Sequence, residues 1–155
     1  MSYLIDTPLL LRIVNRADVQ NTVAEAAIET LRQQGEVLHI APQNLVEFRN
    51  GATRPVEVNG LGLSQTVAEA QAEEFEKKFW LLPETPEIYP AWKALVGAAG
   101  VTGKQVHDAR LVAMCQVYGV SLILTFNVRH FARLALFDPG ITIVDPASIL
   151  YDSHY

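Results

Sequence analysis

Tyr3-Leu4-Ile5-Asp6-Thr7-Pro8 opens the chain as an apolar run that stops at an acidic residue and continues into a Thr-Pro pair. The apolar run predicts a short buried strand, and Pro8 suits the first turn of a helix that begins directly after it. Asp6 lies at this junction. Because a carboxylate is costly to bury alone, we expect Asp6 to need a hydrogen bond, a cation or a metal ion.

Strands and helices alternate along the rest of the chain. Apolar or alternating runs predict further strands at 36–41, 80–82, 120–125 and 141–144. Helical spacing predicts helices that start at Pro8 and that cover 22–34, 42–54, 63–79, 87–99 and 105–118, with a long loop-like stretch at 51–62. This order predicts an α/β fold whose central parallel sheet of four to five strands is covered by helices on both faces.

The composition fits one domain over residues 1–155. Half of the residues are hydrophobic, which excludes a disordered chain and allows a real core. The single cysteine, Cys115, excludes an internal disulfide and a multi-cysteine zinc site, and its apolar neighbours predict core packing. No signal-type segment or bilayer-length apolar run is present, so we expect a cytoplasmic protein without a membrane partner.

The formal net charge of −5 argues against a general nucleic-acid binder with a basic face. It does not exclude an enzyme that acts on nucleic acid, since acids that hold metal ions would account for part of the negative balance. Eight cations remain available to meet phosphates, although most are expected to be solvated surface charges: Arg12, Arg16, Arg49, Arg54, Lys104, Arg110, Arg129 and Arg133.

Three acids interrupt apolar segments that lie far apart in the chain. Besides Asp6, Glu47 sits inside the run 44–48, and Asp108 lies near the start of a helix that is apolar almost all round. Ligands of parallel sheets bind at the carboxyl ends of strands, where Asp6 and Asn127 are both expected. We therefore predict that the fold gathers these side chains into one acidic pocket.

Crowded carboxylates repel one another unless a cation lies between them. Mg²⁺ and Mn²⁺ prefer oxygen ligands, and such an ion can activate water and neutralise charge on a phosphodiester. The residues alone leave an alternative open, in which the three acids are a helix cap, a buried ion pair and a surface residue. Likewise, Thr7 and Thr125 either hydrogen-bond the carboxylates or only terminate strands.

The chain resembles a PIN-domain ribonuclease of the kind found as the toxin in VapC-type toxin–antitoxin pairs. Five segments, in an order and spacing that cover nearly the whole chain, carry the resemblance: Tyr3–Thr7, Asn44–Phe48, Val106–Ala113, Leu122–Asn127 and Gly140–Pro146. It implies a PIN-like three-layer fold, a metal-dependent endoribonuclease acting on RNA, and a homodimer. It also implies a cognate antitoxin that blocks the cleft, with an inserted arginine as the expected device.

By motif position, the resemblance gives Asp6 and Asp108 the main metal-ligand role, with Mg²⁺ or Mn²⁺ as the ion. Glu47 would be the third acid, which binds the metal directly or through water, or orients the attacking water. The fourth acidic position of the family is Asn127 here, which keeps a carbonyl oxygen but loses the charge, and a nearby acid of some relatives is His130.

Two other functions stay open. One is a catalytically weakened PIN-fold module that binds RNA or protein, because Asn127 lowers the ligand charge. The other is a receiver-like domain phosphorylated on an aspartate, which explains the apolar helix around Asp108 less well. The histidines at 39 and 154 have no expected role, and no two histidines have the helical spacing of zinc ligands.

Overall fold

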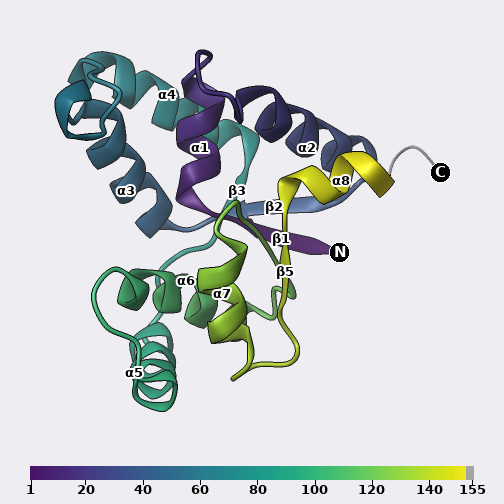
Figure 1. The fold of residues 1–155 in the computed structure, drawn as a ribbon. Helices are drawn as coiled ribbons and strands as arrows, with labels where there is room; N and C mark the ends of the chain where they lie inside the picture. Colours follow the sequence, from purple (N-terminus) through teal and green to yellow (C-terminus); the bar gives the residue numbers. More distant parts are fainter. Residues whose placement is uncertain (153–155) are drawn as a thin grey trace.

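The computed structural model describes residues 1–152, and His154 lies outside this part of the chain. Strands and helices alternate as the sequence predicts (Figure 1). The strands are β1 (Ser2–Ile5), β2 (Val37–Ile40), β3 (Trp80–Leu81), β4 (Leu122–Leu124) and β5 (Thr142–Val144). The α-helices are α1 (Thr7–Val14), α2 (Asn21–Gln33), α3 (Pro42–Thr53), α4 (Gln65–Lys78), α5 (Ile88–Ala99), α6 (Gln105–Tyr118), α7 (Val128–Ala135) and α8 (Pro146–Asp152).

The five strands form one sheet in the order β3-β2-β1-β4-β5, and every neighbouring pair is parallel. Central β1 sets the register, because Tyr3 lies beside Leu38 on one side and Leu122 on the other. The predicted parallel sheet of four to five strands is therefore confirmed, with five strands.

Helices cover both faces of the sheet. One apolar cluster joins the sheet to α1, α2, α3, α4 and α8, and a second joins it to α5, α6 and α7 (Figure 1). Neighbouring side chains of β1 point to opposite faces of the sheet and so pack in different clusters. Ile5 packs in the first cluster and Leu4 in the second. This is the predicted three-layer arrangement. None of the described helices combines the length and apolarity that crossing a membrane requires.

Helices α7 and α8 are absent from the sequence-based prediction. Both are short, with eight and seven residues, so each has room for only a few core contacts. In α7 these are Phe131 and Leu134, one turn apart and fully buried. The helix predicted over 42–54 is confirmed by α3, and the loop-like stretch predicted over 51–62 begins within this helix and contains a short 3₁₀ turn at Val56–Val58.

Two glycines, one near the end of α3 and one in the loop that follows, allow close packing. At Gly51, α3 meets α1 so closely that a β-carbon would lie 2.9 Å from Leu11 Cδ1. At Gly60 a β-carbon would lie 1.8 Å from the Arg54 carbonyl oxygen, so only glycine fits there. The loop folds back on the helix end through backbone bonds, among them Gly62 N–H to the Arg54 carbonyl at 2.9 Å.

Candidate active site

Strands β2 and β3 lie on one side of β1, whereas β4 and β5 lie on its other side, so the strand order changes direction between β1 and β4. Parallel sheets bind their ligands in the crevice at such a point. Asp6 follows β1 directly, and Thr125 follows β4 directly. The two strand ends are joined by a backbone bond from Asp6 N–H to the Leu124 carbonyl at 3.0 Å. The sheet topology therefore places Asp6 at the crevice.

Both carboxylate oxygens of Asp6 accept hydrogen bonds. Oδ1 accepts from the Thr7 backbone N–H at 2.9 Å, which makes Asp6 the N-cap of α1. Oδ2 accepts from the Thr125 hydroxyl at 2.7 Å. The side chain is 3 % exposed, and Thr125 is fully buried. Of the two roles that the sequence left open for Thr125, the structure shows the hydrogen bond.

Glu47 lies on α3 and is half-buried. Its Oε1 accepts from the Thr7 hydroxyl at 3.1 Å and from Gln43 Nε2 at 3.3 Å. Thr7 thus contacts two of the predicted acids, by its backbone and by its side chain. Thr7 Oγ1 also accepts from the buried amide of Asn44, whose own Oδ1 accepts from the Ala41 N–H at 2.7 Å and so caps α3.

Asn44 was not among the predicted site residues. Its signal in the sequence is a polar residue at the third position of a helix that Pro42 opens, where the amide can reach back to the chain before the helix.

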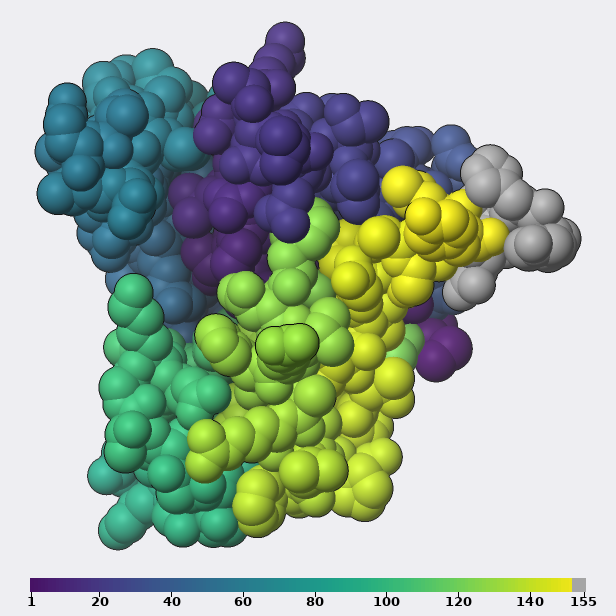
Figure 2. All heavy atoms as spheres, viewed as in Figure 1, coloured from purple at the N-terminus to yellow at the C-terminus, as the bar shows by residue number. Residues whose placement is uncertain are grey.

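All four predicted site residues line a single cavity of about 700 Å³: Asp6, Glu47, Asp108 and Asn127. The cavity lies where α1, α3, the start of α6 and the start of α7 come together, in the hollow between the purple, blue, green and yellow-green segments of Figure 2. His107 and His130 line it as well. Residues more than a hundred positions apart in the chain therefore face the same space.

The cavity is electrostatically unfavourable for carboxylates. Burial is the main cause that raises the pKa of Asp6 to about 7, and the charges of Asp108 and Glu47 raise it further, against the hydrogen bonds from Thr125 and Thr7. Burial likewise raises the pKa of Asp108 to about 6, together with the charge of Glu47 and against the imidazoles of His130 and His107. The charges of Glu47 and Asp108 therefore act on neighbouring acids across the cavity.

The donor set fits a hard divalent cation, because carboxylate oxygens that raise one another's pKa are stabilised by positive charge. Within residues 1–152, however, no three histidine, cysteine, aspartate or glutamate side chains are grouped closely enough to hold an ion together. Mg²⁺ usually binds through only one or two carboxylates and keeps several waters. Such an ion would bind some of these acids directly and the others through water.

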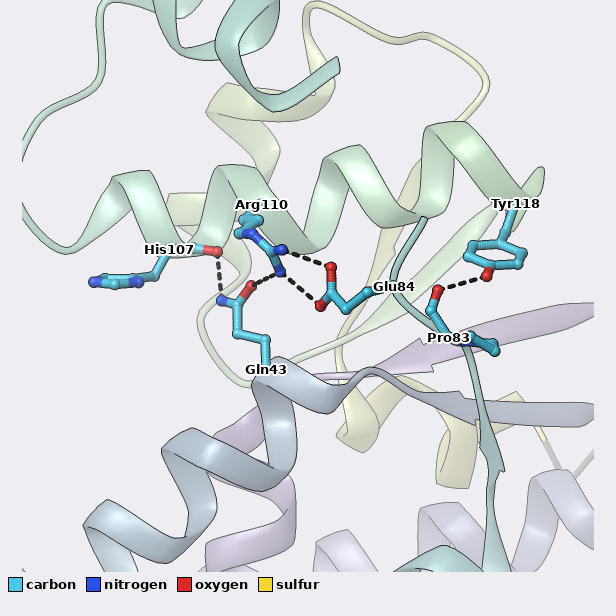
Figure 3. Close-up of polar contacts among 6 residues, drawn as sticks. All are labelled: Gln43, Pro83, Glu84, His107, Arg110 and Tyr118. Atoms are coloured by element: carbon cyan, nitrogen blue, oxygen red, sulfur yellow. Dashed lines mark hydrogen bonds and ion pairs between the residues drawn. The ribbon is translucent and has the colours of Figure 1, made fainter. Parts of the chain in front are cut away.

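Gln43 joins the two helices that carry Glu47 and Asp108. Its Nε2 donates to Glu47 on its own helix at 3.3 Å. It also donates to the His107 carbonyl on α6 at 2.8 Å (Figure 3). Arg110 Nη1 donates to the Gln43 Oε1 at 3.4 Å, which fixes the direction in which the amide points. Arg110 itself forms a bidentate pair with Glu84, at 2.6 and 3.0 Å (Figure 3).

Comparison with known proteins supports the architecture. No protein-family model and no curated protein sequence matches this chain. Solved structures do match. One is VapBC2 from Rickettsia felis bound to a DNA fragment from their promoter, with a TM-score of 0.69 and 13% identity over 94% of this chain and 98% of that chain.

Two further matches agree with the first. DNA-bound VapBC from Salmonella typhimurium has a TM-score of 0.63 and 19% identity, over 94% of this chain and 98% of that one. VapC20 from Mycobacterium tuberculosis, described as a Sarcin-Ricin loop cleaving toxin, has a TM-score of 0.61 and 18% identity, over 84% and 93%. At such identities the likeness establishes the fold, and the predicted PIN-like fold is confirmed.

Proposed function

We propose that this protein is a metal-dependent endoribonuclease that hydrolyses RNA phosphodiester bonds in the cytoplasm, as the toxin of a toxin–antitoxin pair. The observation that carries the proposal is the meeting of Asp6, Glu47, Asp108 and Asn127 around one cavity at the point where the strand order reverses. The fold likeness to VapBC structures, including one toxin described as cleaving the Sarcin-Ricin loop, supports it.

Each side chain has a role that its contacts support. Asp6 is oriented for metal binding by Thr7 and Thr125 before any ion arrives. Asp108 faces the same cavity from α6 and would be the second ligand. Bound Mg²⁺ or Mn²⁺ would lower the pKa of a water and stabilise negative charge on the phosphate. Glu47 has its Oε2 free of hydrogen bonds within the described part of the chain, and that oxygen can orient a water.

Asn127 contributes an amide in place of a fourth carboxylate. It is exposed, lines the cavity, and is the third residue after β4, where its backbone N–H donates to Thr125 Oγ1 at 2.9 Å. An amide supplies a neutral oxygen and an N–H donor. We expect it to contact the metal's water or the phosphate, and to leave any second ion weakly bound.

The proposed protein partners are a cognate antitoxin and a second copy of the chain. Solved VapBC complexes of the same fold support the antitoxin, which would cover the acidic cavity with a cation such as arginine. Co-purification with the product of a neighbouring small reading frame tests the first partner. Sedimentation of the purified chain tests the homodimer.

Cleavage of single-stranded RNA in Mg²⁺ or Mn²⁺ tests the proposed activity. We expect Asp6→Asn and Asp108→Asn each to lower the cleavage rate by about 100-fold or more, the range seen when a group central to the chemistry is lost. Asp138→Asn is the matched control, because this loop acid does not line the cavity. Undiminished cleavage in both site variants would reject the assignment.

The weakened-module alternative makes a different prediction. It expects no cleavage and no rise in thermal stability at millimolar Mg²⁺ or Mn²⁺, whereas a metal-binding native state must be stabilised by its ligand. Metal-dependent stabilisation that disappears in Asp108→Asn would favour the nuclease.

A further inference from the structure

Three of the eight cations singled out in the sequence are committed to partners away from the cavity. Arg12 lies 3.4 Å from Asp18, Arg49 lies 2.7 Å from Glu69, and Arg110 forms the bidentate pair with Glu84. Their charges are already compensated. From the sequence alone, Arg110 and Lys104 were equally available to meet phosphates, because both flank Asp108.

Arg54 and Lys104 differ from these three, because both line the acidic cavity and neither forms an ion pair within residues 1–152. Both side chains are exposed. Arg54 is the C-cap directly after α3, the helix of Glu47, and Lys104 is the N-cap directly before α6, the helix of Asp108. Each helical wall of the cavity therefore carries one acid and one uncompensated cation.

The spacing along α3 is regular. Asn50 and Gly51 lie three and four residues after Glu47, so these residues share one face of the helix. Arg54, the C-cap of α3, follows Asn50 by four residues and Gly51 by three, and all four line the cavity. At 1.5 Å per residue, Arg54 lies about 10 Å along the helix from Glu47, and Lys104 lies about 6 Å before Asp108. The backbone bonds of the following loop, including Gly62 to Arg54, hold the α3 end in place.

We propose that Arg54 and Lys104 bind backbone phosphates of single-stranded RNA on either side of the bond to be cleaved, so that the strand lies in the groove between α3 and α6. This inference rests on the proposed function. A chain of net charge −5 with three acids in the cavity repels a polyanion, so local cations are needed to retain it. RNA is favoured over an acidic protein surface because phosphates recur along the strand and can meet both walls.

RNA binding without cleavage tests the proposal directly. Fluorescence anisotropy of a labelled single-stranded RNA is measured against KCl concentration for Asp108→Asn, which prevents turnover, and for the same variant with Arg54→Ala or Lys104→Ala added. We expect each added substitution to weaken binding about five- to tenfold near 0.1 M salt. Each should also reduce the slope of log Kd against log salt by about 0.7, the value for one phosphate of a single strand.

Arg16→Ala in the same background is the matched control. Arg16 is an exposed cation without an ion pair in the described residues, in the α1–α2 loop and outside the cavity lining. It should leave the slope unchanged. Arg54→Lys should restore most of the slope, since it keeps the charge.

Equal slopes in Arg54→Ala, Lys104→Ala and Arg16→Ala would overturn the proposal. Binding of an acidic peptide in preference to RNA would overturn it too, in favour of an acidic protein surface at this groove. RNA that binds with the expected slopes but is never cut by the unmodified chain would contradict the proposed nuclease and leave the phosphate assignment standing.

Discussion

The cavity has two unlike walls. On the strand side, Asp6 is 3 % exposed and both of its oxygens accept hydrogen bonds from neighbours fixed by the sheet. On the helix side, Asp108 is half-buried and accepts no hydrogen bond from the described residues, and Glu47 is held only by Thr7 and Gln43. The position of Asp6 thus follows from strand register, whereas that of Asp108 follows from how α6 packs.

Asp6 is thus a preorganised carboxylate, and Asp108 is an adjustable one. A carboxylate locked by hydrogen bonds needs little rearrangement to meet an ion, but its burial is unfavourable while no ion is present. A carboxylate that accepts no hydrogen bond can move toward a cation. Substitutions can test the two walls separately.

The largest expected effect is on the strand side. Without metal at pH 8, we expect Asp6→Asn to raise the free energy of unfolding by up to about 4 kcal/mol, because the native state no longer buries a charge whose pKa rises from 3.8 to about 7. The amide can still accept from the Thr7 N–H and pair with the Thr125 hydroxyl. Urea unfolding in EDTA measures this difference. A destabilised Asp6→Asn would show that burial of the charge is not the dominant cost.

The unmodified chain should show the same effect as a pH dependence. A carboxyl whose native pKa is raised binds more protons when folded, so its stabilising contribution is complete below pH 4 and is lost as the pH rises toward 7. In EDTA, we expect the unfolding free energy to fall between pH 4 and pH 7 through this group. Saturating Mg²⁺ should reduce the decline, and Asp6→Asn should remove most of it. A decline of the same size in Asp6→Asn would assign it to other groups.

Thr125→Val tests the bond that orients Asp6. Removal of the hydroxyl deletes its bond to the Asp6 carboxylate and its bond from the Asn127 N–H. We expect a loss of about 2 kcal/mol in unfolding free energy at pH 8, the range for a buried hydrogen bond to a charged group, and weaker Mn²⁺ binding in calorimetry. The control is Thr142→Val, at an exposed position of β5, which should change neither quantity appreciably.

The helix side offers a matched pair of substitutions with smaller effects. Arg110→Met and Arg49→Met each remove a bidentate, partly exposed pair with a glutamate, and such surface pairs contribute little to stability. Only Arg110 also holds Gln43, which links α6 to Glu47. We therefore expect similar small losses of stability, but a several-fold weaker Mn²⁺ affinity in Arg110→Met alone. Equal affinities in the two variants would show that Gln43 needs no support from Arg110.

The strand side was the part that the sequence could predict. An apolar run that ends in Asp6 already implies a strand end, and parallel strands bring their carboxyl ends to one edge, so Asp6 and Asn127 could be placed together before any coordinates were known. Glu47 and Asp108 were singled out because each interrupts an apolar segment, and the resemblance to a family added only their expected roles. The fold followed from the alternation of strands and helices.

The helix side could not be predicted in the same way. The Gln43 amide and the His107 carbonyl meet only because α3 and α6 pack at that distance, and no local pattern encodes a contact across 64 residues. Nor could the sequence distinguish Arg110 from Lys104, since their partners are set by tertiary packing. Helix α7 was missed because two buried residues give too short a periodic signal.

The close approach at Gly51 has a practical consequence. Gly51 and Leu11 both line the cavity, and any side chain added at position 51 must displace Leu11 within that space. A bulky substitution at position 51 would fill part of the cavity without replacing any of the acids. The proposed activity would harm the cell that makes the protein, so we expect a variant with a filled cavity to be easier to express. Such a variant keeps all native charges for titration and crystallisation.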